Sequence, residues 1–103
     1  MSSAENAFDA IGEGIDGAVA GKMFGVRCYK IQGKAFMSFF HECLVCKLPE
    51  GPREHALSLE GAHLFDPSGK GRPMREWVQI PESNSDAWPE LAIASQDYVV
   101  SLI

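Results

Sequence analysis

Apolar side chains recur every three or four positions over residues 4–20, which is the spacing of one helix face. Ser2 and Glu5 fit a capping box in front of this segment, and Gly21 fits the residue at which a helix ends. Three glycines inside the segment each cost up to about 1 kcal/mol relative to alanine. We therefore expect a helix over 4–20 that depends on docking against a sheet.

Short runs of aromatic and aliphatic residues follow, and they predict strands over 24–31, 34–40 and 42–48. Gln32-Gly33 and His41-Glu42 fit the reversals between them. Connections this short predict an antiparallel meander. Both faces of such a sheet carry apolar side chains, whereas the predicted helices are enough for one face. A homodimer through the second face is therefore one hypothesis.

The second half of the chain predicts a helix over 52–59 that Gly61 ends, and strands over 62–66 and 74–80. Asp86 fits the cap of a last helix. The inward residues of that helix are predicted to be Trp88, Leu91, Ala92, Tyr98, Val99 and Leu102. The layout α-βββ-α-ββ-α is that of a two-layer α+β fold with an antiparallel sheet. A chain of 103 residues predicts a single domain over 1–103.

Charge adds a basic middle between two acidic ends. The net charge is −5, yet all nine Lys and Arg lie between residues 22 and 75 with only five acids. The negative total disfavours attraction of nucleic acid or anionic lipid over the whole surface. The sequence has no apolar run long enough to span a bilayer and no positive leader, so we expect a cytoplasmic protein without a membrane partner. The three cysteines are expected to stay reduced.

Candidate chemistry is sparse. Cys43 and Cys46 have C-x-x-C spacing, but in a strand residues three apart face opposite sides, so we expect no metal site there. The sequence contains neither the G-x-S-x-G nucleophile elbow nor the H-E-x-x-H motif of zinc proteases. It also lacks the G-x-G-x-x-G dinucleotide-binding motif and the Walker phosphate-binding loop. We therefore expect no catalytic residues, no cofactor and no enzymatic activity.

Residues 66–73, with the start of the strand that follows, are the most distinctive stretch. Lys70, Arg72 and Arg75 place three cations within six residues, and Trp77 follows. Flexible glycines beside the cations and a nearby indole predict anion binding or base stacking. The alternative is structural: the glycines serve a turn, an arginine pairs with Asp66 or Glu76, and Trp77 packs against a helix. Lys47 extends this basic surface only if the fold brings it close.

Four segments of the chain resemble a known family. They are Met23-Phe24-Gly25, Gly33-Lys34-Ala35-Phe36, Lys47-Leu48-Pro49 and the run from Leu64 to Met74, LFDPSGKGRPM. They look like the TfoX amino-terminal domain and the related YjbR (MmcQ) group, over most of the chain from about residue 22. The resemblance implies a small α+β fold of the secretion-chaperone-like type. It also implies a regulatory or DNA-binding role, without catalytic residues to carry over.

The function expected from the sequence is a non-enzymatic binding or regulatory module with a protein or nucleic-acid partner. Lys70, Arg72 and Arg75 are the predicted anion contacts, and Trp77 is the predicted stacking or packing residue. Two alternatives stay open. One is a small-molecule site for an anionic ligand, or an enzymatic site, near residues 66–73. The other is a homodimeric interaction protein.

Overall fold

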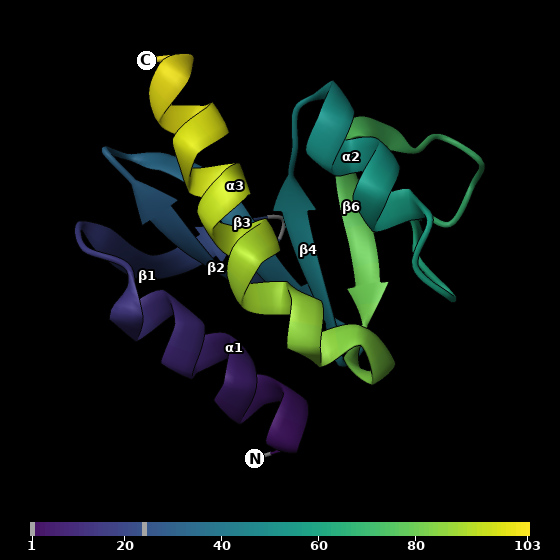
Figure 1. Ribbon diagram of the computed structural model, residues 1–103, viewed down its shortest axis with the longest axis horizontal. Helices are drawn as coiled ribbons and strands as arrows, with labels where there is room; N and C mark the ends of the chain where they lie inside the picture. Colours follow the sequence, from purple (N-terminus) through teal and green to yellow (C-terminus); the bar gives the residue numbers. More distant parts are fainter. Residues whose placement is uncertain (1, 24) are drawn as a thin grey trace.

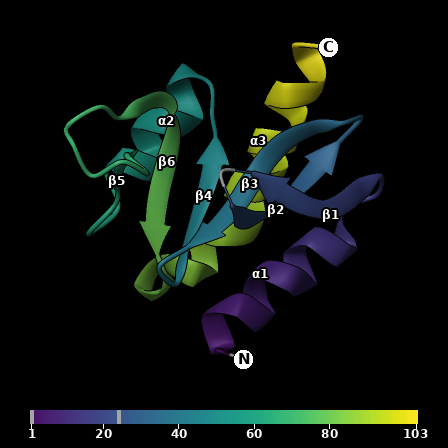
Figure 2. The same cartoon turned by 180° about the vertical axis from the view of Figure 1, so that it is seen from behind.

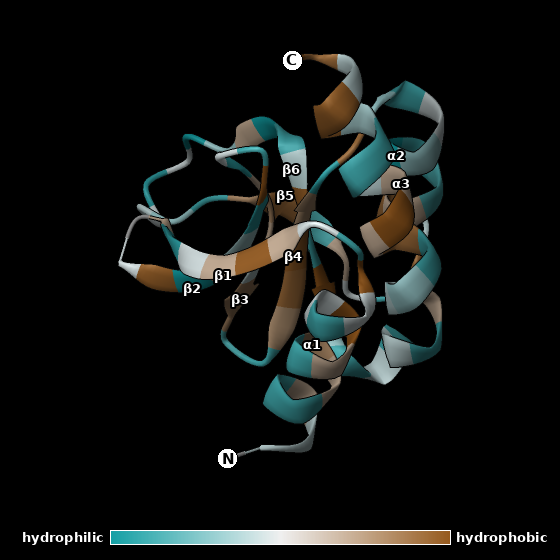
Figure 3. Cartoon of the chain, turned by 90° about the vertical axis from the view of Figure 1, so that its left-hand side faces the viewer, coloured by the Kyte–Doolittle hydropathy of each residue, from teal (hydrophilic) through white to brown (hydrophobic). Residues whose placement is uncertain are grey.

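The computed structural model describes residues 2–23 and 25–103, and these form an α+β fold of two layers (Figure 1). The elements run in the order α1 (Ser3–Gly14), β1 (Ala18–Met23), β2 (Val26–Ile31), β3 (Lys34–Phe40), β4 (Cys43–Lys47), α2 (Glu50–Leu57), β5 (His63–Phe65), β6 (Met74–Pro81), η1 (Glu82–Ala87) and α3 (Trp88–Ser101). The strands make one antiparallel sheet in the order β1-β2-β3-β4-β6-β5. Seen from the side, the helices lie on one face of this sheet (Figure 3). The predicted class is confirmed, with one strand more than expected.

The additional strand is β1, and it replaces the second half of the predicted helix over 4–20. The helix begins as expected, with the Ser2 hydroxyl accepting a hydrogen bond from the Glu5 N–H at 3.0 Å. It ends at Gly14, and Gly17 then turns the chain at a φ of +85°, a conformation that favours glycine. Gly21 is a strand residue that pairs with Cys28, so its predicted role as the helix end is wrong.

Two tight turns fix the register of the meander. Gln32 and Gly33 both have positive φ, at 50° and 82°, and so do His41 and Glu42, at 49° and 62°. Two consecutive residues with positive φ give the turn whose twist matches antiparallel strands. Both predicted reversals are confirmed. The first predicted strand starts at Phe24, which lies outside the described residues, and β2 itself begins at Val26.

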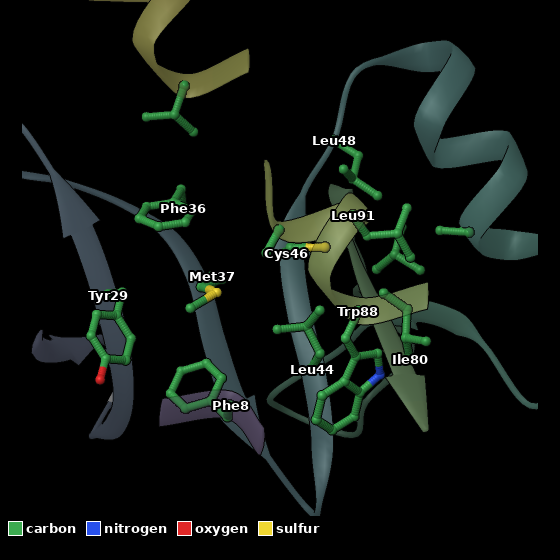
Figure 4. Packing of buried hydrophobic residues seen from close by; sticks show 14 of the residues in the cluster. Phe8, Tyr29, Phe36, Met37, Leu44, Cys46, Leu48, Ile80, Trp88 and Leu91 are labelled. Atoms are coloured by element: carbon green, nitrogen blue, oxygen red, sulfur yellow. The ribbon is translucent and has the colours of Figure 1, made fainter. Parts of the chain in front are cut away.

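The main core lies between the helices and the sheet (Figure 4). Its largest fully buried side chains include Trp88 of α3, Phe8 of α1, and Phe36 and Met37 of β3. In the close-up, Trp88 lies beside Leu44. Burial of these side chains is the principal stabilising contribution to a fold of this size, at about 25 cal/mol per Å² of apolar surface.

The first helix is held to the sheet by a close approach and an ion cluster. A Cβ at Gly12 would lie 2.3 Å from the Tyr29 ring, so this helix position accepts only glycine without a shift. On the same side of the sheet, the Arg27 guanidinium donates to Glu5 at 2.7 Å and to both carboxylate oxygens of Asp9. These contacts supply the docking on which the glycine-rich helix depends.

Three details at the later helices differ from expectation. Asp86 lies within η1, and α3 begins after Ala87 without a side-chain capping bond, so the predicted cap is wrong. The inward stripe of α3 is confirmed for Trp88, Leu91, Ala92 and Val99, whereas Tyr98 is half-buried and Leu102 remains 56% exposed. In addition, α2 ends at Leu57, and Gly61 instead forms a turn before β5 at a φ of +81°.

The sheet face away from the helices, seen from behind in Figure 2, carries a second apolar cluster. We call it the outer cluster: Val45, Phe65 and Trp77, with Met23, Ala35, Phe40 and Met74 packed against them. The Phe65 and Phe40 rings meet edge to face, with centroids 5.2 Å apart. The three central residues are at most 8% exposed, so the strands and their connections bury them without a helix. A homodimer through this face stays a prediction.

Two further properties concern the described residues alone. None of their helices combines the length and the apolar character that crossing a membrane requires. No three of their His, Cys, Asp or Glu side chains gather as metal ligands would.

Cys28, Cys43 and Cys46 are free thiols and are buried. Burial raises the pKa of the Cys46 and Cys28 thiols above the usual value.

Candidate functional site

Strand register brings several basic segments to one end of the sheet. Because every neighbouring pair is antiparallel, β3 and β6 begin at the end where β4 and β5 finish. The loop over residues 66–73 connects β5 to β6 at this same end, and it projects beyond the edge of the sheet (Figures 1 and 2). We call these loop residues together with Arg75 the basic loop.

The conformation of the basic loop is organised by one carboxylate. Asp66 Oδ1 accepts hydrogen bonds from the Ser68 hydroxyl at 2.7 Å, the Ser68 N–H at 3.2 Å and the Gly69 N–H at 3.1 Å. Asp66 Oδ2 accepts from the Gly71 N–H at 2.9 Å and the Arg72 N–H at 3.2 Å. Gly69 and Gly71 have φ values of 67° and 77°, which turn their amides toward the carboxylate. The backbone donors that a phosphate would use are therefore already occupied.

These hydrogen bonds also set the ionisation of Asp66. The Ser68 hydroxyl makes the largest contribution, and the amides of Gly71, Arg72 and Gly69 add to it, so the pKa of Asp66 lies below its ordinary value of 3.8. Hydrogen bonds to a charged carboxylate favour the charged form. The carboxylate is consequently ionised, and it engages the loop backbone instead of a cationic side chain.

The cations of the basic loop have no such partner. Lys70, Arg72 and Arg75 are exposed, and within residues 2–23 and 25–103 no carboxylate oxygen lies within 4.0 Å of their charged nitrogens. The alternative in which Arg72 or Arg75 pairs with Asp66 or Glu76 does not occur. The structure leaves all three predicted anion contacts open to solvent, with Lys70 and Arg72 in the loop over residues 66–73 and Arg75 at the start of β6.

Trp77 differs from the other predicted site residues. It lies on β6 opposite Lys47, is 8% exposed and packs in the outer cluster with Val45 and Phe65. Base stacking requires an accessible ring face, so the burial of Trp77 argues against its predicted stacking role. Its alternative role in packing is confirmed, although its neighbours are strand residues and not a helix.

Lys47 does belong to the basic end of the molecule. It lies on the sheet face opposite to Leu44 and Cys46, as the alternation predicts, and its ammonium is 3.7 Å from Glu76 Oε1. The other oxygen of Glu76 accepts a hydrogen bond from the Tyr98 hydroxyl, which raises the pKa of Tyr98. Glu76 is thus the acid that moderates charge here, and it acts on Lys47 and not on the loop.

Sequence reasoning missed Lys34, which the register places at the same end. It is the first residue of β3, three residues before Met37, which pairs with Cys46 near the end of β4. Lys34 and Lys47 are far enough apart in the chain that only the hairpin register relates them. That register was the available signal, since two-residue turns were already predicted on both sides of β3.

Chemically, the basic loop is suited to binding anions by charge. Guanidinium groups retain their positive charge and bind carboxylate or phosphate oxygens through paired N–H donors. Charge-assisted contacts of this kind order an anionic partner without covalent chemistry.

Comparison of the chain with protein-family models, with curated proteins and with solved structures found no significant match in any of the three.

Proposed function

We propose that the protein is a non-enzymatic binding module that holds an anionic partner at the basic loop. One observation carries the proposal: Asp66 is committed to loop amides, so Lys70, Arg72 and Arg75 stay without an ion-pair partner within the described residues. Two unpaired cations in the loop and a third at the start of β6 favour contact with phosphate or carboxylate groups.

The burial of Trp77 narrows the kind of partner. Single-stranded nucleic acid is bound largely by stacking of bases on aromatic rings, and both rings that flank the loop in the chain, Phe65 and Trp77, are packed inside the outer cluster. Duplex DNA presents phosphates without any need for stacking, and an acidic protein surface presents carboxylates. The proposed recognition is therefore by charge and position.

The family and the compartment belong to the same proposal. We propose that the chain is of the TfoX/YjbR type with a secretion-chaperone-like fold, on the residues quoted for that resemblance. The α+β layers and the antiparallel sheet support it at the level of fold class. A cytoplasmic location is proposed because the three cysteines are free thiols.

The test is an anisotropy titration of two labelled probes, a short DNA duplex and a poly-glutamate peptide, at about 50 mM salt. The triple variant Lys70→Gln/Arg72→Gln/Arg75→Gln removes the proposed contacts. Exposed charge pairs contribute up to about 1 kcal/mol each, so we expect affinity to fall by about tenfold to a hundredfold. Lys22→Gln, at an exposed lysine of β1, is the matched control and leaves affinity unchanged.

Two results would contradict the proposal. One is the absence of saturable binding of either probe to the wild-type protein. The other is binding that the triple variant retains in full, since the anionic partner would then contact a different surface.

A further inference from the structure

The strand β1 forms a long free edge of the sheet. Among the described strands, in the order β1-β2-β3-β4-β6-β5, only β1 and β5 have a neighbour on one side alone. Their lengths differ, because β5 (His63–Phe65) has three residues and β1 (Ala18–Met23) has six. Figure 3 looks onto β1, which crosses the front of the molecule with no other described element over it. Of the two edges, the one at β1 is therefore long enough to pair with a further strand.

The regularity of β1 favours such pairing. All six residues pair with β2 in one unbroken register. Edge strands are commonly protected by prolines and bulges, and β1 contains neither. Ala18, Ala20 and Gly21 have small side chains, which leave the outward N–H and C=O groups of the strand accessible. A second strand can therefore form hydrogen bonds along the whole length of β1.

The charges along this edge are complementary to a second copy of the same chain. Lys22 lies near the end of β1, Asp16 lies two residues before its start, and both are exposed. In the part of the chain that the structure describes, neither has an opposite charge within 4.0 Å. Six residues of extended chain are about 20 Å long, so the two side chains are too far apart to pair within one copy. An antiparallel second copy brings Asp16 of each chain toward Lys22 of the other, whereas a parallel copy would bring like charges together.

Val19 adds apolar surface at the same edge. It is 65% exposed, the largest exposed fraction among the exposed large hydrophobic side chains of the described residues. It shares a strand face with Met23, and Met23 packs against the outer cluster. When the helices of two paired copies lie on the same side, residues of this face adjoin the same face of the second copy. Pairing at β1 thus extends the outer cluster across two chains and removes Val19 from water.

We propose that two copies of this chain associate edge to edge through β1, antiparallel and about a two-fold axis, so that their sheets become one continuous sheet. The strand backbones supply the hydrogen bonds, and the contact between Asp16 and Lys22 occurs twice by symmetry. We call this interface the β1 edge dimer. It leaves the basic loop free, because that loop joins β5 to β6 at the opposite edge of the sheet.

Other modes of association match these observations less well. Two copies stacked through the sheet faces away from the helices would have little apolar surface to bury, since Val45, Phe65 and Trp77 are already at most 8% exposed. An extended peptide of another protein would also find the free backbone of β1. The opposite charges at the two ends of the strand, however, make an antiparallel copy of this chain the complementary occupant.

The experiment is sedimentation velocity of the full chain over protein concentrations from about 10 µM to about 1 mM, where we expect a reversible monomer–dimer equilibrium. Asp16→Lys and Lys22→Glu each bring like charges together twice, so each is expected to weaken dimerisation by about tenfold. The double variant Asp16→Lys/Lys22→Glu restores opposite charges and is expected to dimerise as wild type. Asp97→Lys, at an exposed acid of α3, is the charge-matched control and leaves dimerisation unchanged.

Amide hydrogen exchange locates the interface without any substitution. In an antiparallel strand, the N–H groups of alternate residues point away from the neighbouring strand. We expect the exchange of these alternate amides in β1 to slow as the protein concentration rises, while exchange in β5 stays the same.

Three results would overturn the β1 edge dimer. They are a monomer throughout the concentration range, dimerisation that neither single charge reversal weakens, and a double variant that dimerises no better than the single variants. A dimer built on the outer sheet face gives the second result, and an edge that binds only a foreign peptide gives the first. The inference is independent of the proposed function. Its test contains no anionic probe and its variants leave the basic loop intact, so failure of one proposal is distinguishable from failure of the other.

Discussion

Replacing Trp77 by alanine is predicted to destabilise the fold strongly and to affect partner binding only through that loss. The side chain is 8% exposed and packs against Val45 and Phe65, which are themselves fully buried. This packing on the sheet face away from the helices explains why the indole is a core residue. An indole that served a ligand would have a free face.

The magnitude follows from the buried area. A large aromatic side chain buries about 150–250 Å², which at about 25 cal/mol per Å² gives about 4–6 kcal/mol as an upper limit. Measured truncations of buried Phe and Trp to Ala cost about 3–5 kcal/mol. Because the outer cluster lies on the sheet face without a covering helix, we expect about 3 kcal/mol for Trp77→Ala. The total free energy of unfolding of native proteins is about 5–15 kcal/mol, so the variant is expected to remain folded but to be marginally stable.

The assay is urea unfolding followed by circular dichroism, with Trp77→Phe as a conservative companion. We expect Trp77→Phe to cost about 1 kcal/mol and to leave anion affinity unchanged. A cost below about 1 kcal/mol for Trp77→Ala, together with weaker anion binding by Trp77→Phe, would refute the packing role and restore the stacking role.

Three further predictions rest on separate contacts. Gly12→Ala pushes a methyl group into the Tyr29 ring and is expected to destabilise the fold by about 1–3 kcal/mol in thermal unfolding, whereas Gly14→Ala, with open space around it, is neutral or slightly stabilising. The hydrogen bonds that lower the pKa of Asp66 order the loop at pH values above 3.8, the ordinary pKa of the group. This ordering is lost as the pH falls through the lowered pKa. Loop amide shifts followed by NMR show the transition, and Asp66→Asn lacks it. Burial raises the pKa of Cys46, so its thiol is expected to react with a thiol reagent only after unfolding; rapid labelling of native protein at this position would contradict its place in the core.

The sequence predicted those parts of the fold that local chemistry decides. The reversals at Gln32-Gly33 and His41-Glu42 follow from short polar pairs between apolar runs, and both hold. The helix over 4–20 was wrong beyond Gly14, because its apolar spacing fits a strand as well once the chain turns at Gly17. Pairing of β1 with the next strand, β2, is a tertiary contribution that helical periodicity does not weigh.

In the candidate site, too, the features decided by neighbouring residues were predictable, and those decided by contacts between strands were not. Lys70, Arg72 and Arg75 are close in sequence, so their exposure near the same end of the sheet was predictable, and so was a role for the loop glycines. The role of Asp66 as the acceptor for loop amides was not predicted, since an Asp-Pro-Ser-Gly run fits several turns. The sequence left stacking and packing both open for Trp77, because its burial depends on Phe65 and Val45, which other strands supply.

The central claim is that the cations of the basic loop bind the anionic partner, and the salt dependence of affinity tests it most directly. Three phosphate contacts predict a slope of about −2.7 for log affinity against log salt with duplex DNA, which is a loss of about 40-fold between 50 and 200 mM. Arg72→Gln is predicted to reduce the slope of log affinity against log salt by about one third, because one of three phosphate contacts is removed. A slope that Arg72→Gln and the triple variant leave at its wild-type value would contradict the claim.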